Sequence, residues 1–281
     1  MKWSDIVEFI KVKDPSFLTN AQGVPLADIQ KVEKQRGLKL PQIYVDFLQT
    51  MGKHDGGSVI FGNNYLHDFY NLNQLNPDEP PRSKRYFKIA DHDETNDMAY
   101  MSTFLDLDRS DGQDAPLVED EENYPKTITP ETADDTNDTL SVVLESRVFR
   151  YFETAKRKEE LSLILHLSEY KDGVDKTSKP GETYEEYMAK LKPFSPKSAK
   201  ERMGQIMAVL EKYGLKLALP ELPTYACMSR ADLSATVDIA GELNLIAVNL
   251  SRDEKSDTDT IVDDLEKTIP GLKVYETWHK Y

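Results

Sequence analysis

The chain has 281 residues, with 39% hydrophobic and 30% charged side chains and a formal net charge of −15; this is typical of soluble globular proteins with one large domain or two. No apolar run is long enough for a membrane-spanning helix, and the acidic N-terminal segment does not fit a secretory signal. A single cysteine, Cys227, excludes an internal disulfide framework and multi-cysteine metal centres, so we expect a cytoplasmic protein.

Apolar spacing in the first half of the chain predicts helices followed by strands. Trp3, Ile6 and Ile10 recur at the period of a helix. Pro41 suits the first turn of a helix, where its missing N–H costs nothing. The predicted elements are helices near residues 3–12, 26–36 and 41–51, strands near 86–90, 99–107 and 117–118, a long loop over 119–138, and a helix over 140–158.

The second half of the chain has a pattern of its own. Residues 161–167 alternate leucines as in a strand but lie in a helix-forming context, so either element remains open. Ser198 with Glu201 is a candidate capping box at the start of a helix. Further strands are predicted near 225–229, 234–239, 243–250 and 272–277, and a helix over 261–269. We therefore predict two domains, residues 1–158 and 159–281, the second a small α+β unit with one sheet and helices on one face. The alternative is that the second half is an elaboration packed on the first domain.

Two stretches of the first half resemble a known family. The first combines an acidic residue on one helix with a Leu-Pro step, an aromatic and apolar next helix and a glycine-rich turn: Glu33, Leu40-Pro41, Tyr44, Phe47-Leu48 and Gly56-Gly57. The second is a strand over 99–108 followed by Asp111-Gly112 and residues 116–118. Together they resemble the SMI1/KNR4 family, also called the SUKH superfamily, over roughly residues 20–155. The turn at 51–57 is longer than the family's usual Asn-Gly-Gly.

The resemblance implies a fold and two classes of function. Its fold is α+β, a SUKH-like antiparallel sheet with packed helices. Many bacterial members look like immunity proteins, which block a toxin encoded beside them, whereas eukaryotic members look like intracellular scaffold or regulatory proteins. We interpret the Leu-Pro signature as a packing pattern that identifies the fold and does not itself bind the partner.

The acidic residues concentrate in one segment. Between Asp91 and Asp138 there are sixteen acidic residues against Arg109 and Lys126, a net charge of −14, and the rest of the chain is nearly balanced. Such a field repels nucleic acid and anionic membranes and attracts a basic protein. A solvated loop that keeps the protein in solution is the equally weighted alternative.

We therefore predict an immunity protein whose acidic face occludes the active site of a basic, nuclease-like protein toxin. Aromatic and amide side chains beside the signature turn are further candidate anchors, and a buried strand with tyrosine hydroxyls at its edge is the equal alternative. The candidate partner-binding residues are Asp91, Asp93, Glu94, Asp97, Asp108, Asp111, Asp114, His54, Asp55 and Tyr65. The sequence leaves the toxin and the oligomeric state open.

The sequence matches catalytic and metal-binding motifs poorly. The run of residues 91–94 (Asp-His-Asp-Glu) fits a charged turn better than a metal site, because adjacent residues on an extended chain point to opposite sides. A calcium loop counted from Asp106 fails, since its fifth, sixth and twelfth positions hold Ser110, Asp111 and Leu117. Zinc-protease, nucleophile-elbow and phosphate-loop motifs do not occur. We expect no enzyme, cofactor or metal; a metal-dependent hydrolase using the acidic loop is the remaining alternative.

Overall fold

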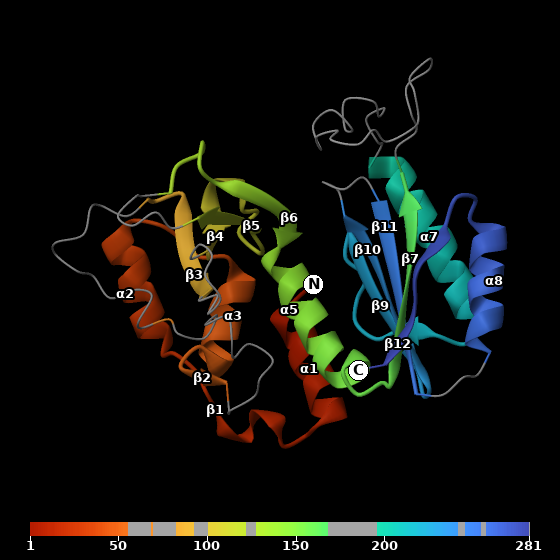
Figure 1. Ribbon diagram of the computed structural model, residues 1–281. Helices are drawn as coiled ribbons and strands as arrows, with labels where there is room; N and C mark the ends of the chain where they lie inside the picture. Colours follow the sequence, from red (N-terminus) through yellow and green to blue (C-terminus); the bar gives the residue numbers. More distant parts are fainter. Residues whose placement is uncertain are drawn as a thin grey trace, which may run out of the picture. The chain divides into compact units, whose positions relative to one another are not determined.

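A computed structural model describes residues 1–55, 69, 83–92, 101–121, 128–167, 196–240, 245–253 and 257–280. The chain divides into two compact units, Met1–Phe152 and Glu153–Tyr281 (Figure 1). The boundary predicted after Lys158 lies slightly further along the chain. Helices and antiparallel sheets occur in both units, so the predicted α+β class is confirmed.

The N-terminal unit begins with helices in the predicted places. They are α1 (Trp3–Lys13), the 3₁₀ turn η1 (Phe17–Asn20), α2 (Leu26–Arg36) and α3 (Gln42–Met51). Trp3 of α1 meets Phe47 of α3 edge-on with ring centroids 5.2 Å apart, and its Nε1 donates to Thr50 Oγ1 at 2.8 Å. Gly37 ends α2 because it adopts a φ of 65°, a conformation that glycine takes without strain.

A two-stranded sheet follows α3 and ties its end to the chain before α2. The strands are β1 (Ala21–Gln22) and β2 (His54–Asp55). Gly23 lies so close to α3 that an added Cβ would be 1.7 Å from the carbonyl oxygen of Gln49. A side chain at residue 23 would therefore force the two segments apart.

A four-stranded antiparallel sheet forms the other layer of this unit among the described residues. It has the order β3 (Tyr86–His92), β4 (Met101–Asp106), β5 (Pro116–Glu121) and β6 (Asp134–Thr139). Phe87, Leu105 and Leu117 lie side by side across three strands and are buried. Tyr44 of α3 packs edge-on against Phe87 with ring centroids 6.0 Å apart, so α3 covers this face.

The prediction of a loop over residues 119–138 is wrong at both ends, where the structure has strands. Strand β5 continues to Glu121, and residues 134–139 (DDTNDT) form the edge strand β6. Side-chain preference disfavours a strand here, but Thr136 Oγ1 donates to the carbonyl of Leu117 at 3.0 Å and Asp135 pairs with Arg109. Ile128 also packs on Val118 from the other face of the sheet. Tertiary contacts therefore hold a strand that its own sequence does not favour.

The unit closes with helix α5 (Leu140–Phe149) and the first residues of a π-helical turn, η3 (Arg150–Thr154). The helix predicted over 140–158 is thus correct at its start but ends four residues early. Phe152 contacts Phe9 and Phe17, with ring centroids 6.2 Å and 5.4 Å away. These aromatic contacts join the end of the unit to its first helix.

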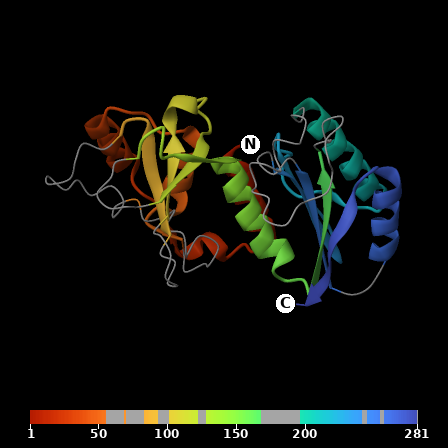
Figure 2. The ribbon, with the colours of Figure 1, turned by 45° about the horizontal axis from the view of Figure 1, so that its top comes forward.

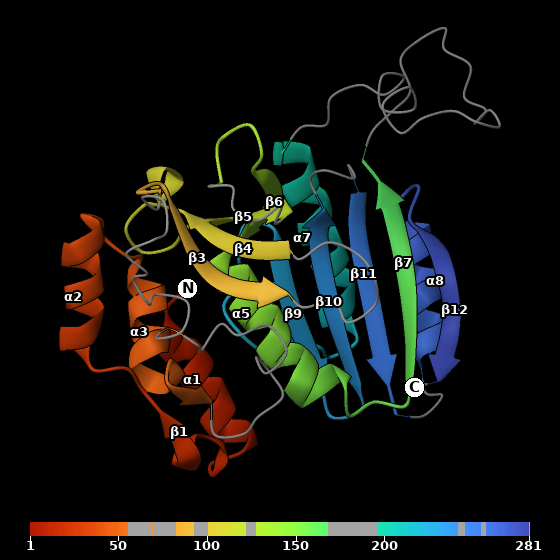
Figure 3. The same ribbon diagram turned by 60° about the vertical axis from the view of Figure 1, so that its left-hand side comes forward.

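The C-terminal unit is built on one antiparallel sheet, with six strands among the described residues. The strands are β7 (Glu159–His166), β8 (Lys216–Leu217), β9 (Tyr225–Arg230), β10 (Leu233–Ala240), β11 (Leu245–Arg252) and β12 (Lys273–Lys280). Their order is β12-β7-β11-β10-β9-β8. Figure 3 shows the part from β12 to β9. The ambiguous run at 161–167 is therefore mainly a strand. Its alternating leucines meet alternating apolar residues of β11.

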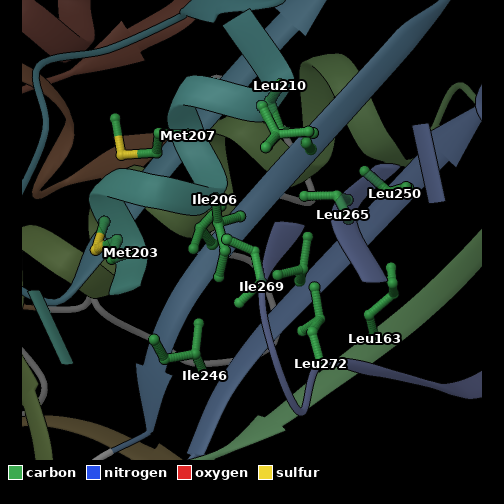
Figure 4. Packing of buried hydrophobic residues seen from close by; sticks show 14 of the residues in the cluster. Leu163, Met203, Ile206, Met207, Leu210, Ile246, Leu250, Leu265, Ile269 and Leu272 are labelled. Carbon is green, nitrogen blue, oxygen red and sulfur yellow. The ribbon is translucent and has the colours of Figure 1, made fainter. Parts of the chain in front are cut away.

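Helices α7 (Pro196–Lys212) and α8 (Thr258–Thr268) lie on the same face of this sheet (Figure 2). Apolar side chains of α7 and α8 meet those of β7 and β11 in one core, drawn in Figure 4 with Met203, Ile206, Leu210, Leu265 and Leu250 among them. Helix α7 begins two residues before Ser198, so the capping box predicted there is wrong. In the described part of the chain, no helix combines the length and apolar character needed to cross a bilayer.

Candidate partner-binding surface

The Leu-Pro signature forms the corner between α2 and α3. Glu33 is buried, and its carboxylate accepts the backbone N–H of Leu40 at 3.0 Å and the ammonium of Lys39 at 2.9 Å. Pro41 then precedes α3 directly, and Tyr44 and Phe47 are fully buried on the helix that follows. The carboxylate thus fixes the chain just before the helix, and the aromatic residues pack the core.

The loop between β4 and β5, residues 107–115, is bound to the start of α3. The backbone N–H groups of Gln42 and Ile43 donate to the carbonyl oxygens of Gly112 and Gln113, each at 3.0 Å. These are first-turn donors, which have no partner within their own helix. The helix therefore holds the loop in place, and we call residues 107–115 the acidic loop.

Asp111 shapes the acidic loop from within. Its Oδ1 accepts the backbone N–H groups of Gln113 and Asp114, each at 2.8 Å. These hydrogen bonds, that of Asp114 first, lower the pKa of the Asp111 carboxyl. The side chain remains exposed and charged, so Asp111 can face a partner while it keeps the turn closed.

Asp114 has a structural role that its sequence position does not indicate. Its Oδ1 accepts the N–H of Ala115 at 2.8 Å and that of Ser141, in the first turn of α5, at 3.3 Å. An acidic group at a helix N-terminus satisfies a free donor and favours the helix dipole. We therefore assign Asp114 to the support of the loop and of α5.

A buried carboxylate in the same region was missed by sequence reasoning. Asp106, fully buried at the end of β4, accepts hydrogen bonds from Arg85 Nε and Nη2 at 2.9 and 2.8 Å and from Arg109 Nε at 2.7 Å. Burial alone would raise the pKa of Asp106, but the hydrogen bonds from Arg85 and Arg109 outweigh it and lower the pKa. Arg109 also pairs with Asp135 of β6. Part of the acidic segment is thus neutralised internally.

Asp108 is a second exposed carboxylate of the acidic loop. Its side chain is 71% exposed, and its Oδ2 lies 3.9 Å from Arg85 Nε. A pair at that distance and exposure is weak. Of the predicted contact residues, Asp108 and Asp111 are thus brought together on one rigid, exposed loop.

The other predicted residues lie elsewhere. Asp91 belongs to β3, where its backbone is opposite Ser102. His54 is exposed in β2, with Asp55 beside it in the strand, and both follow the C-terminal end of α3, while the acidic loop contacts the N-terminal end. The ten residues of α3 separate the two places by about 15 Å. The structure therefore does not bring His54 and Asp55 to the acidic loop; Asp93, Glu94, Asp97 and Tyr65 lie outside the described residues.

The fold and this surface define an α+β domain with a rigid acidic loop supported by helix α3. Residues 23–140 match the model of the SMI1/KNR4 family (SUKH-1), so the predicted family is confirmed and the N-terminal unit contains an SMI1/KNR4 domain. The match covers less than half of the 281 residues and ends before the C-terminal unit begins. No curated protein and no solved structure matches the chain. Within the described ranges, no group of three or more potential metal-ligating side chains occurs.

Proposed function

We propose that this chain is a non-enzymatic immunity protein that binds a basic protein toxin through its acidic loop. The observation that carries the proposal is the position of Asp108 and Asp111 on a loop fixed to the first turn of α3 in an SMI1/KNR4 domain. A loop that is already ordered loses little conformational freedom when it binds, which favours affinity.

The proposed mechanism is occlusion of the toxin's active site. A nuclease-like toxin holds phosphate groups with lysine and arginine, and carboxylates at the right spacing occupy the same positions. Long-range attraction between the acidic segment and such a toxin raises the association rate, and this part of the effect weakens as salt is added. The contact itself then blocks access of the nucleic acid.

The test compares two variants with the same change in charge. Asp108→Lys combined with Asp111→Asn removes the two exposed negative charges of the acidic loop and keeps the Oδ1 acceptor that closes the turn. Glu201→Lys combined with Glu211→Gln makes the same charge change on the exposed side of α7. The partner is the toxin domain encoded immediately upstream, if such a gene is present, in an inactivated form. Calorimetry at two salt concentrations measures its dissociation constant.

The loop variant is expected to bind about tenfold more weakly or worse and to lose part of its salt dependence, while the α7 variant stays within about twofold. Co-expression with the active toxin should show the same order in cell survival. Equal affinity for both variants would mean that the acidic loop is not the contact. Binding without protection from the toxin would instead favour the scaffold or regulatory role of the family.

A further inference from the structure

Helix α2 presents a basic surface on a strongly acidic protein. Of its eleven residues, Ile29 and Glu33 are the buried ones. On the opposite side of the helix lie Lys31 and Lys34, three residues apart and exposed. The helix is thus attached along a narrow stripe and turns a polar, positively charged side outward.

Two further lysines extend this surface beyond the helix. The ammonium of Lys84, before β3, lies 3.4 Å from the position that a Cβ on Gly37 would take, so it lies over the end of α2. Lys39 is 84% exposed, with its ammonium on the buried carboxylate of Glu33. Within the described residues, Lys31, Lys34 and Lys84 have no carboxylate partner. We call Lys31, Lys34, Lys39 and Lys84 the lysine surface.

The lysine surface is held in place by Arg36. Its Nη2 donates to the carbonyl oxygens of Ser83 and Tyr86 at 3.0 and 3.3 Å, and its guanidinium lies 4.6 Å from the centroid of the Phe87 ring. Basic residues in the last turn of a helix favour its dipole, which accounts for Arg36 and Lys34. The dipole does not account for Lys31, in the middle of α2.

The acidic loop is a neighbour of the lysine surface. Lys84 is followed by Arg85, whose Nε lies 3.9 Å from Asp108 Oδ2. Lys39 precedes by three residues the N–H of Gln42, which binds Gly112 of the loop. Surfaces of opposite charge thus adjoin on one unit. Two copies related by a two-fold axis can then pair, because the lysine surface of each copy faces the acidic loop of the other.

We propose that two copies of this chain associate with the lysine surface of one on the acidic loop of the other, reciprocally. Each copy carries a net charge of −15, and this repulsion is screened beyond about 8 Å at physiological salt. The association is therefore weak and strongest at intermediate ionic strength. It covers Asp108 and Asp111, so a basic partner of the acidic loop competes with the second copy.

Sedimentation velocity of the full chain, over a wide concentration range and several salt concentrations, tests this inference. The wild type is expected to shift toward a dimer as concentration rises at about 0.15 M salt and to return to a monomer at high salt. Lys31→Glu with Lys34→Glu should stay monomeric. Lys200→Glu with Lys216→Glu, at exposed positions of the C-terminal unit with the same net charge, should keep the dimer.

A second pair, Lys31→Gln with Lys34→Gln, removes the charge without placing an acidic group near the C-terminal end of α2, and circular dichroism checks that each variant is folded. A wild type that stays monomeric under all conditions overturns the inference, as does a dimer that survives loss of Lys31 and Lys34. The lysine variants leave Asp108 and Asp111 intact. Their self-association can therefore fail while binding of a basic toxin is retained or strengthened, and the two proposals are separated.

Discussion

The sheet of the C-terminal unit and the outer strands of the N-terminal sheet are held by different kinds of side chain. In the C-terminal sheet, Leu163, Val248, Val237 and Ala226 face one another across four strands and are fully buried. In the N-terminal sheet, Val118 of β5 pairs with Asp135 of β6, and Arg109 joins that carboxylate to Asp106. The C-terminal sheet depends on apolar volume at this place, and the outer strands of the N-terminal sheet depend on charges that are paired in space.

This difference indicates where each unit is sensitive to change. A core of interdigitating apolar side chains responds to lost volume and little to pH. A sheet edge held by carboxylates and arginines responds to protonation and to charge, and it keeps acidic groups at the surface for a partner. The acidic edge of β6 also discourages pairing with a strand of another chain.

The largest effect is expected for Leu163→Ala in the C-terminal core. Leu163 is fully buried between β11 and β12, and truncation of such a leucine costs about 2–5 kcal/mol through lost burial and the cavity left behind. Hydrogen exchange read by mass spectrometry should show the loss of protection in β7 and β11. Leu217→Ala, at a position 42% exposed, is the control and should change stability by less than about 0.5 kcal/mol.

Asp106→Asn should have the next largest effect, in the N-terminal unit. The variant leaves Arg85 and Arg109 without their shared carboxylate, but these side chains are 34% and 39% exposed. Solvent screens the two arginines, so we expect the free energy of unfolding to fall by about 2 kcal/mol, less than for a fully buried ion pair. Hydrogen exchange of β3 and β4 at neutral pH measures it.

The pH dependence of the same variant is a second readout. Because the pKa of Asp106 is lowered in the folded state, its contribution is present above the unfolded-state value of about 3.9 and is lost as pH falls through the folded-state pKa. The wild type should therefore lose stability in this acid range more steeply than Asp106→Asn. Asp108→Asn, at an exposed carboxylate, is the control. Parallel acid titrations of wild type and Asp106→Asn would contradict the assigned role.

Asp114→Ala separates support of the acidic loop from contact with a partner. Loss of the carboxylate frees the N–H groups of Ala115 and Ser141, and loss of such a cap costs about 1 kcal/mol. Asp108→Ala should leave the thermal midpoint within about one degree, because the side chain is largely exposed. Affinity for a partner should show the opposite order, with the greater loss in Asp108→Ala. Equal thermal midpoints would contradict the supporting role assigned to Asp114.

Sequence periodicity predicted the helices and strands whose own residues carry a clear apolar pattern. Helices α2 and α3 and strands β9, β10 and β11 were predicted to within about two residues, which is the usual uncertainty at element ends. Their apolar residues follow the helix and strand periods, and those periods do not depend on distant parts of the chain.

The candidate site was only partly predictable, since its geometry depends on residues far apart in sequence. Arg85 and Asp106 are 21 positions apart, and Asp114 supports an N–H group 27 positions away. The sequence shows that the segment is acidic but not which carboxylates are buried by arginines. For the same reason it could not predict β6, whose residues disfavour a strand until β5 and Arg109 are in place.

The smallest predicted effect concerns the signature residue Tyr44. It tests whether the N-terminal core, like the C-terminal core, depends on apolar packing alone. The Tyr44 hydroxyl is fully buried and has no hydrogen-bond partner among the described residues; burial also raises the pKa of this group. A buried hydroxyl without a partner destabilises the folded state, so Tyr44→Phe should leave stability unchanged or raise it by up to about 1 kcal/mol. Denaturant unfolding measures the difference, with Tyr44→Leu as a control that also removes the ring contacts with Phe47 and Phe87. A clear loss of stability in Tyr44→Phe would mean that the hydroxyl makes a hydrogen bond in solution.

No loss would mean that the ring alone, by packing between α3 and the sheet, accounts for the aromatic residue at this place in the signature.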